Sequence, residues 1–346
     1  MPFSILQGDV TRVGARLIVN PTDPDYSGSG GLDRQIHHLA GPELARHCAA
    51  LPRLDYGRAV LTPAFELGAL AVIQTAAPVW TPGGESEALL RSCYRESLAL
   101  VRALDAPTVA LPLIGTGTQA YPRALALRIA QEEIRAHLAL CEDSFVTLVI
   151  HDRSQFQPDP ELCEELGRHL DSRSRPRLQN RPSAEPSAPS PRRDRRRPAF
   201  SASMEFPGAA PEAFSDADLD LAAAPRLPEE ALVLDESFSQ MVLRLIREKG
   251  FEKDSDCYLR ANLDRKHFSK IRCNVDYHPK KSTALALAVA LRLSLPETRE
   301  LLMKAGYTLS PSILGDVIVE YCLSQGIYDI FTINDLLFEK DQTLLG

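Results

Sequence analysis

The stretch Leu17–Asp33, with the sequence LIVNPTDPDYSGSGGLD, decides the fold of the N-terminal half of this 346-residue chain. It begins with an apolar run that predicts a buried strand. A glycine-rich loop follows, and helical periodicity extends from Leu32 to Leu39. Glycines let backbone N–H groups approach an anion closely, and a helix N-terminus adds a positive partial charge. The stretch therefore predicts a strand, a loop and a helix that together bind an anionic group.

Strands and helices alternate over the rest of residues 1–170. The chain opens on a strand-like run, and further apolar runs predict strands at Leu70–Ile73, Val109–Leu111 and Val146–Ile150. Segments of helical period lie at Glu87–Leu104 and Pro122–Leu140. This alternation predicts a mostly parallel or mixed sheet that is covered by helices on both faces.

A second glycine-rich loop, Ile114–Pro122, also lies between a predicted strand and a predicted helix. Loops that follow neighbouring strands meet at the same end of a sheet. Two such loops can hold a diphosphate from both sides with their backbone amides.

Several motifs in order resemble the macrodomain family. They are Gly8–Thr11, Ile18–Asn20, Asp33 with Ile36-His37 and Ala40-Gly41, Tyr56–Ala59, Val72–Pro78 and Ala110–Pro112. The resemblance covers residues 1–170 and implies a mixed sheet sandwiched between helices, with a cleft for ADP-ribose or an ADP-ribosylated protein. It also implies hydrolysis of ADP-ribosyl esters, either protein-linked ADP-ribose or O-acetyl-ADP-ribose. A reader that binds ADP-ribose without turnover is the alternative.

The resemblance implies a role for each motif residue. Asp9 would accept a hydrogen bond from the adenine amino group, Val10 would line that pocket, and Asn20 would shape the ribose end. Asp33 would position or activate water, and His151 would either stack on adenine or merely pack. Backbone amides would wrap the diphosphate at Gly28, Ser29, Gly30, Gly31, Leu32, Gly115, Thr116, Gly117 and Thr118.

The chain departs from the family at three positions. Asp23 stands where hydrolytic relatives have an asparagine that orients ribose and water, so Asp33 and Asp23 are the candidate catalytic pair. Two carboxylates near a diphosphate repel one another, so we expect one of them to bind a proton or Asp23 to turn away. Gln119 replaces an aromatic residue, and Ala120 replaces a glycine. These departures concern turnover and affinity, and they leave the predicted fold unchanged.

Residues 171–228 contain ten prolines and show no sustained apolar period. Such a segment buries too little surface to offset the entropy of ordering, which predicts a disordered linker. Its arginine run, Arg192–Arg197, is interpreted as a solvated stretch or as a weak, non-specific attraction to nucleic acid.

Residues 229–346 predict an all-α domain. Helices expected at Phe238–Gly250, Asp254–Ala261, Arg265–Arg272, Lys281–Leu293 and Glu297–Ala305 resemble the helix-turn-helix domain of phage repressors. The resemblance implies that the third helix enters the major groove of DNA, with Phe268 and Ile271 facing the core. Its DNA-facing residues would be Arg265, Lys266, His267, Lys270 and Arg272. A scaffold that recruits a protein is the alternative.

The last segment, Ile313–Gly346, adds two helices beyond the repressor pattern. Their apolar faces predict either a homodimer interface or packing against the preceding helices.

The net charge and the cysteines limit the classes of protein to which this chain can belong. A net charge of −7 argues against a chain that coats nucleic acid along its whole length. The seven cysteines form no Cys-x-x-Cys pair, so we expect reduced thiols rather than disulfides or a zinc site. We find no secretion signal and no apolar run near the roughly 18 residues of a membrane span. We therefore expect a cytoplasmic protein with no membrane contact, metal or cofactor. The resemblance to macrodomains implies ADP-ribose as its ligand.

Overall fold

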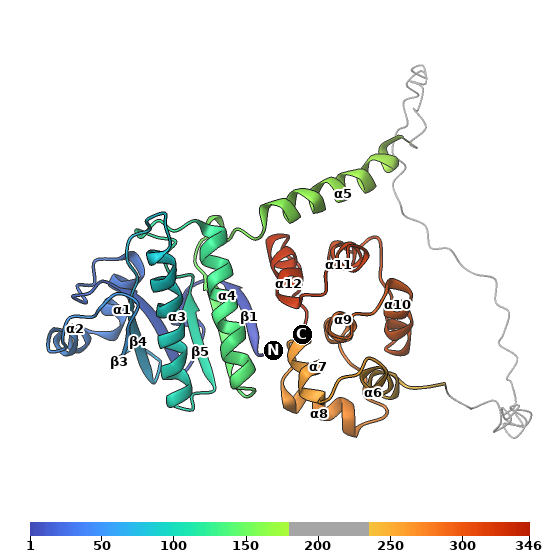
Figure 1. Cartoon of the computed structure of the whole chain (residues 1–346), viewed down its shortest axis with the longest axis horizontal. Coiled ribbons are helices and arrows are strands. Elements are labelled where there is room, and N and C mark those ends of the chain that lie inside the picture. Colours follow the sequence, from blue (N-terminus) through green and yellow to red (C-terminus); the bar gives the residue numbers. More distant parts are fainter. Residues whose placement is uncertain (180–234) are drawn as a thin grey trace, which may run out of the picture. The chain divides into compact units, whose positions relative to one another are not determined.

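The computed structural model describes residues 1–179 and 235–346 (Figure 1). Most of the predicted linker therefore lies outside the described residues. Residues 1–171 and 236–346 together form one compact unit. The boundaries at residues 170 and 229, drawn from composition, stay predictions.

The centre of the N-terminal part is a six-stranded mixed sheet. Along the sheet the strands are β1 (Phe3–Gln7), β6 (Phe145–Ile150), β5 (Thr108–Pro112), β2 (Leu17–Thr22), β4 (Ala71–Ala76) and β3 (Ala59–Pro63). All neighbours are parallel except β3, which runs antiparallel to β4. The predicted mixed sheet is confirmed.

Helices cover both faces of this sheet (Figure 1). They are α1 (Gly31–Ala40), α2 (Pro42–Ala49), α3 (Glu85–Ala103) and α4 (Arg123–Leu140). Helix α5 (Pro160–Gln179) completes the N-terminal part. Because strand side chains alternate between faces, Leu17 and Val19 pack in one hydrophobic cluster with α3 and α4, whereas Ile18 packs in another with α1 and α2. The alternation thus sets which side chains of β2 face each of the two clusters.

Five elements differ from the sequence prediction. Strand β3 and helix α2 were not predicted, because β3 is short and partly exposed and α2 buries only Leu44 and Cys48. Two short 3₁₀ helices, η1 (Val10–Arg12) and η2 (Arg153–Gln155), were also missed. The linker was expected to begin at residue 171, but α5 continues to Gln179. The charged and serine residues that follow Leu170 are compatible with a helix, and composition alone does not mark where that helix ends.

The C-terminal part is all-helical, as predicted. Its helices are α6 (Phe238–Glu248), α7 (Asp254–Arg260), α8 (Arg265–Cys273), α9 (Lys281–Ala290), α10 (Leu295–Lys304), α11 (Leu314–Ser324) and α12 (Ile330–Glu339). Ser237 and Gln240 form a capping box at the start of α6, and the Asp264 carboxylate caps α8 by accepting from the His267 amide at 2.8 Å. These polar residues therefore set where the two helices begin.

The sheet edge and the C-terminal helices are in direct contact. The rings of Phe3 and Phe331 stack with their centroids 4.6 Å apart. Asn262 donates from Nδ2 to the Phe3 carbonyl at 2.8 Å and accepts from the Phe3 amide at 2.9 Å. Gln131 of α4 donates to the buried Asp335 carboxylate at 2.7 Å. Apolar and polar contacts thus join β1 and α4 to the helical part.

The apolar faces of α11 and α12 pack inside the chain. Ile318, Cys322, Leu336 and Leu337 are each at most 1% exposed. Of the two interpretations of this segment, packing against the preceding helices is therefore observed, and the homodimer stays a prediction. In the described ranges, no helix combines the length and apolar character needed to cross a bilayer.

Candidate functional site

A cavity of about 390 Å³ opens where β2, β5 and β6 end. Parallel strands deliver their following loops to this edge, which is where open α/β sheets bind ligands. The lining comes from both glycine-rich loops and from the segments after β1 and β6: Gly8, Asp9, Val10, Pro21, Gly30, Gly31, Leu32, Asp33, Gln35, Pro112, Leu113, Gly115, Thr116, Gly117, Thr118, Gln119, Val149, His151 and Gln155. The two predicted loops therefore face one cavity.

The first loop ends at the N-terminus of α1. Gly30 is the N-cap residue, and its carbonyl accepts from the Arg34 amide at 2.9 Å. The amides of the first helical turn, from Gly31 to Asp33, have no acceptor within the helix. Together with the helix dipole they supply partial positive charge at the cavity wall. This arrangement suits an oxyanion.

The second loop is held in a shape that requires glycine at position 115. Gly115 has φ +91°, and a Cβ there would lie 2.7 Å from Cδ2 of Tyr121. The Tyr121 amide donates to the Gly115 carbonyl at 3.0 Å, and buried Tyr94 accepts from the Ile114 amide at 2.8 Å. Ala120 has φ +56°, a left-handed conformation in which glycine is favoured. These contacts with Tyr94 and Tyr121 thus fix the shape of the second loop.

Asp9 lies at one end of the cavity and is the N-cap of η1. Its carboxylate accepts from the Thr11 amide at 2.9 Å and from Gln35 Nε2 at 2.7 Å. Partial burial raises the pKa of Asp9, but the hydrogen bonds from Thr11 and Gln35 outweigh it, so the pKa lies below its ordinary value. Asp9 is therefore an ionised acceptor. Its Oδ1 also accepts from the Thr11 hydroxyl at 2.6 Å, so a further donor would bind at Oδ2, which has Gln35 as its hydrogen-bond donor and Arg12 at 3.6 Å.

A buried polar network holds Asp33 beneath the first loop. Asn20 donates from Nδ2 to Asp33 Oδ1 and to Gln74 Oε1, both at 2.7 Å. The Thr22 hydroxyl donates to Asp33 Oδ2 at 2.9 Å, and His37 Nε2 lies 3.5 Å from Oδ1. Burial raises the pKa of Asp33, and these hydrogen bonds only partly oppose that effect. Asp33 is 1% exposed, yet it forms part of the cavity wall.

Asp23 bonds to its own loop. Its carboxylate accepts from the amides of Asp25 at 2.9 Å and Ser27 at 3.2 Å, and from the Ser29 hydroxyl at 3.2 Å. Burial raises the pKa of Asp23, but these bonds more than compensate, and the pKa lies below its ordinary value. The charge of Asp23 contributes to the raised pKa of Asp33. In this geometry Asp23 shapes the loop.

Most of the residues expected to bind ligand meet at the cavity. Four expected residues do not line it, namely Asn20, Asp23, Gly28 and Ser29. Sequence reasoning missed Gln35 and Gln155 in the lining and missed Thr22 and Gln74 behind it. Only Gln74 carried a signal, since it is the one side-chain amide in the wholly buried strand β4.

The residues expected to contact DNA lie on α8, outside this cavity. Phe268 and Ile271 are buried at 3% and 0% exposure, as predicted. Lys270, with its neighbours Arg265 and Lys266, is exposed. The His267 ring and the Tyr277 hydroxyl lie 2.8 Å apart, and Arg272 pairs with Asp254 at 3.3 Å. The five predicted residues thus share a helix, but two of them have protein partners.

In the part of the chain that the structure describes, no group of three or more His, Cys, Asp or Glu side chains lies close enough together to hold a metal ion. The seven cysteines are free thiols. Burial raises the pKa of Cys48 and Cys93 to about 11, so both are thiols at neutral pH. Backbone amides of the two loops and the carboxylates of Asp9 and Asp33 line the cavity.

The chain is similar to several known proteins. The family model described as Macro domain matches residues 19–130. A macro domain-containing protein of Ralstonia nicotianae is 42% identical over 139 residues, which cover 40% of this chain and 81% of the relative. An O-acetyl-ADP-ribose deacetylase of Cronobacter turicensis is 41% identical over 141 residues, covering 39% of this chain and 80% of the relative. A solved structure of the Oceanobacillus iheyensis macrodomain with ADP is 30% identical, with a TM-score of 0.43 over 49% of this chain and 91% of that one.

The family model places the matching region on the strands and loops that build the cavity. Residues 19–130 include both glycine-rich loops and Asp33. The chain belongs to the macro domain family.

Proposed function

We propose that the cavity at the ends of β2, β5 and β6 binds ADP-ribose. One observation carries the proposal: two glycine-rich loops present backbone amides to a single cavity that has the ionised Asp9 at one end. The amides suit a diphosphate, and Asp9 suits an amino group that donates, such as that of adenine. A relative at 41% identity carries the name O-acetyl-ADP-ribose deacetylase, which agrees with this ligand.

We further propose that the bound ligand is an ester of ADP-ribose and that the domain hydrolyses it. Asp33 has a pKa above the ordinary value for aspartate, which makes it a better proton acceptor near neutral pH. Both of its oxygens already accept one hydrogen bond, and each keeps a further lone pair for water or a ribose hydroxyl. The loop amides would hold the diphosphate and thereby fix the ester relative to Asp33.

The test combines turnover with binding. The full chain is mixed with O-acetyl-ADP-ribose and, separately, with a Glu/Asp-ADP-ribosylated protein, and released acetate or ADP-ribose is followed. Asp33→Asn should slow release while ADP-ribose still binds in calorimetry. Asp25→Asn is the matched control, because Asp25 lies on the same loop and its exposed carboxylate pairs with Arg53. Release that is equal in Asp33→Asn and wild type would remove Asp33 from the mechanism.

A reader of ADP-ribose is the second candidate. The observation in its favour is that Asp33 is 1% exposed and fixed by Asn20 and Thr22, while Asp23 bonds to its own loop. Both carboxylates would then have structural roles. Tight binding without release of ADP-ribose from either substrate would support the reader.

For the helical part we propose binding to DNA through α8, in the manner of a repressor helix. The supporting observation is that Phe268 and Ile271 fix the inner face while Lys270 and its basic neighbours stay exposed. Lys270→Ala should weaken binding of a DNA duplex and reduce its salt dependence. Lys340→Ala, at the far end of α12, is the charge-matched control. A wild-type chain that fails to shift duplex DNA at low salt would leave the scaffold as the remaining function.

A further inference from the structure

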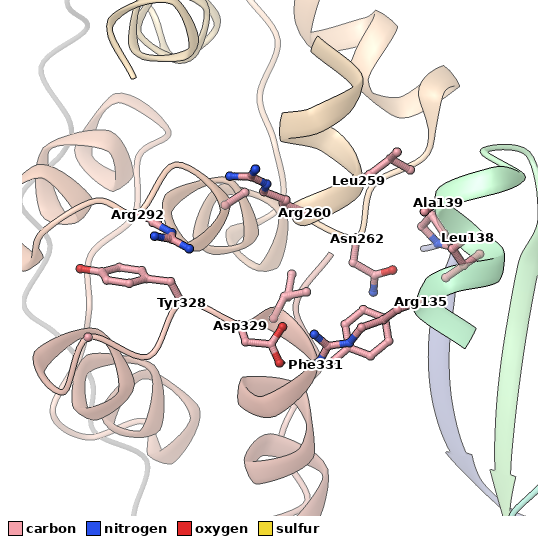
Figure 2. A pocket seen from close by; sticks show the side chains of 14 residues that line it. Arg135, Leu138, Ala139, Leu259, Arg260, Asn262, Arg292, Tyr328, Asp329 and Phe331 are labelled. Carbon is pink, nitrogen blue, oxygen red and sulfur yellow. Dashed lines mark hydrogen bonds and ion pairs between the residues drawn. The ribbon is translucent and has the colours of Figure 1, made fainter. Parts of the chain in front are cut away.

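A second cavity, of about 560 Å³, lies among the C-terminal helices and α4 (Figure 2). Its volume falls within the range of roughly 300–1,000 Å³ that small-molecule sites occupy. It contains no residue of the macro domain cleft described above. Its polar lining comes from Arg135, Arg260, Asn262, Arg292, Tyr328 and Asp329.

The charges of this lining are not balanced. Arg135 pairs with Asp329 at 2.5 Å, which neutralises the one carboxylate in the wall. Arg260 and Arg292 remain, and Figure 2 shows their side chains at the opposite end of the lining from Arg135. Within the described ranges neither has a carboxylate within ion-pair distance. The wall therefore carries an excess of two positive charges.

The backbone and a ring position these two guanidinium groups. Arg260 lies over the Phe251 ring, 5.0 Å from its centroid, which leaves the edge of the guanidinium available for donation. Arg292 follows α9 with φ +51°, a left-handed conformation in which glycine is the favoured residue. The adjacent Leu293 carbonyl accepts from the Tyr328 hydroxyl at 3.2 Å, which ties the turn to the cavity wall.

The remaining lining is apolar. Leu138 and Ala139 of α4, Leu259 of α7, and Ile330 and Phe331 of α12 contribute carbon surface. Such a wall favours the non-polar body of an organic molecule and gives inorganic phosphate little to contact. Guanidinium groups favour oxyanions, and a phosphate monoester carries about −1.5 to −2 charges at neutral pH.

We propose that this cavity is a second ligand site, which binds a small phosphate monoester that has an apolar or aromatic body. Arg260 and Arg292 hold the phosphate, and the apolar wall holds the body. The site lies outside the macro domain cleft, so it does not depend on the function proposed for that cleft.

The experiment titrates the full chain with phenyl phosphate in a calorimeter. Inorganic phosphate tests the charge alone, and benzoate tests the ring with a single negative charge. We expect phenyl phosphate to bind best of the three. Arg260→Ala and Arg292→Gly should each weaken it at least tenfold, and Arg292→Gly suits the left-handed backbone, so it should fold normally.

Two further variants keep the result interpretable. Arg247→Ala removes an exposed arginine of α6 that has no ion pair in the described residues, and binding should be unchanged. Arg292→Lys keeps the charge without the planar fork and should keep part of the affinity if it folds like wild type in thermal unfolding. Undiminished binding in Arg260→Ala and Arg292→Gly would overturn the proposal. So would a wild-type chain that binds none of the three anions, or one in which these arginines matter only for duplex DNA.

Discussion

Replacement of Asp335 by asparagine should stabilise the protein, and the gain should grow with pH. Asp335 lies on α12, is 7% exposed, and accepts from Gln131 of α4 at 2.7 Å. Burial raises the pKa of Asp335 from 3.8 to about 8, although Gln131 opposes the shift. The carboxyl group is therefore protonated in the folded protein at neutral pH, whereas in the unfolded chain it is ionised.

The direction of the pH dependence follows from the proton that unfolding releases. Above pH 3.8 the unfolded chain loses this proton, while the folded chain keeps it up to about pH 8. Unfolding thus releases a proton in that window, and the free energy of unfolding falls as pH rises through it. The slope for one group is about 1.4 kcal/mol per pH unit, so the loss between pH 5 and pH 7 is about 3 kcal/mol. Asparagine does not titrate and keeps an oxygen for Gln131, so Asp335→Asn should lack this loss.

The assay is denaturant unfolding of the full chain and of Asp335→Asn at pH 5, 6, 7 and 8. The difference in unfolding free energy should widen with pH and level off near pH 8. Asp329→Asn on the same segment is the control of opposite sign. Burial raises the pKa of Asp329, but Arg135 lowers it below its ordinary value, so the variant should be less stable than wild type throughout this range. A constant or narrowing difference for Asp335→Asn would refute the reasoning.

Three further variants test the macro domain cavity. Asp9→Ala should weaken ADP-ribose binding by about 1–3 kcal/mol in calorimetry, because a charge-assisted acceptor is lost, and equal affinity would remove Asp9 from the site. Gly115→Ala places a Cβ 2.7 Å from the Tyr121 ring, so binding should fall at least tenfold by the same assay; an affinity like wild type would mean that the loop adapts. Ala120→Gly relieves a left-handed residue at the cost of chain entropy, so denaturant unfolding should show a gain of about 0.5–1 kcal/mol, and a loss would contradict the strain.

The sequence predicts best those elements whose side chains have one dominant environment. Leu17–Val19 and Val146–Ile150 are apolar runs between loops, and each is a buried strand. Strand β3 was missed because its side chains are mostly partly exposed, which erases the alternation that marks a strand. Helix α5 passes the predicted boundary because helix-compatible charged residues resemble a linker in composition.

The residues of the candidate site likewise divide into those that the sequence predicts and those that it does not. Glycines at positions 30, 31 and 115 predict the two loops, because few other residues let the backbone approach a ligand so closely. The sequence does not identify the polar residues that support the loops. Thr22 bonds to Asp33 and Gln74 bonds to Asn20 only once the chain has folded and β2 has paired with β4. The direction of the Asp23 carboxylate was likewise open, because it depends on the turn that Ser27 and Ser29 make.

The pairing of Asn262 with Phe3 has a consequence for assembly. Strand β1 is the outermost strand of the sheet, and an outermost strand presents unpaired N–H and C=O groups to which another chain can add. The Asn262 side chain supplies both a donor and an acceptor to one residue of that strand, much as a neighbouring strand would. The helical part thereby blocks strand addition at this edge. A chain shortened to the sheet and its helices would expose the edge and gain a route to aggregation.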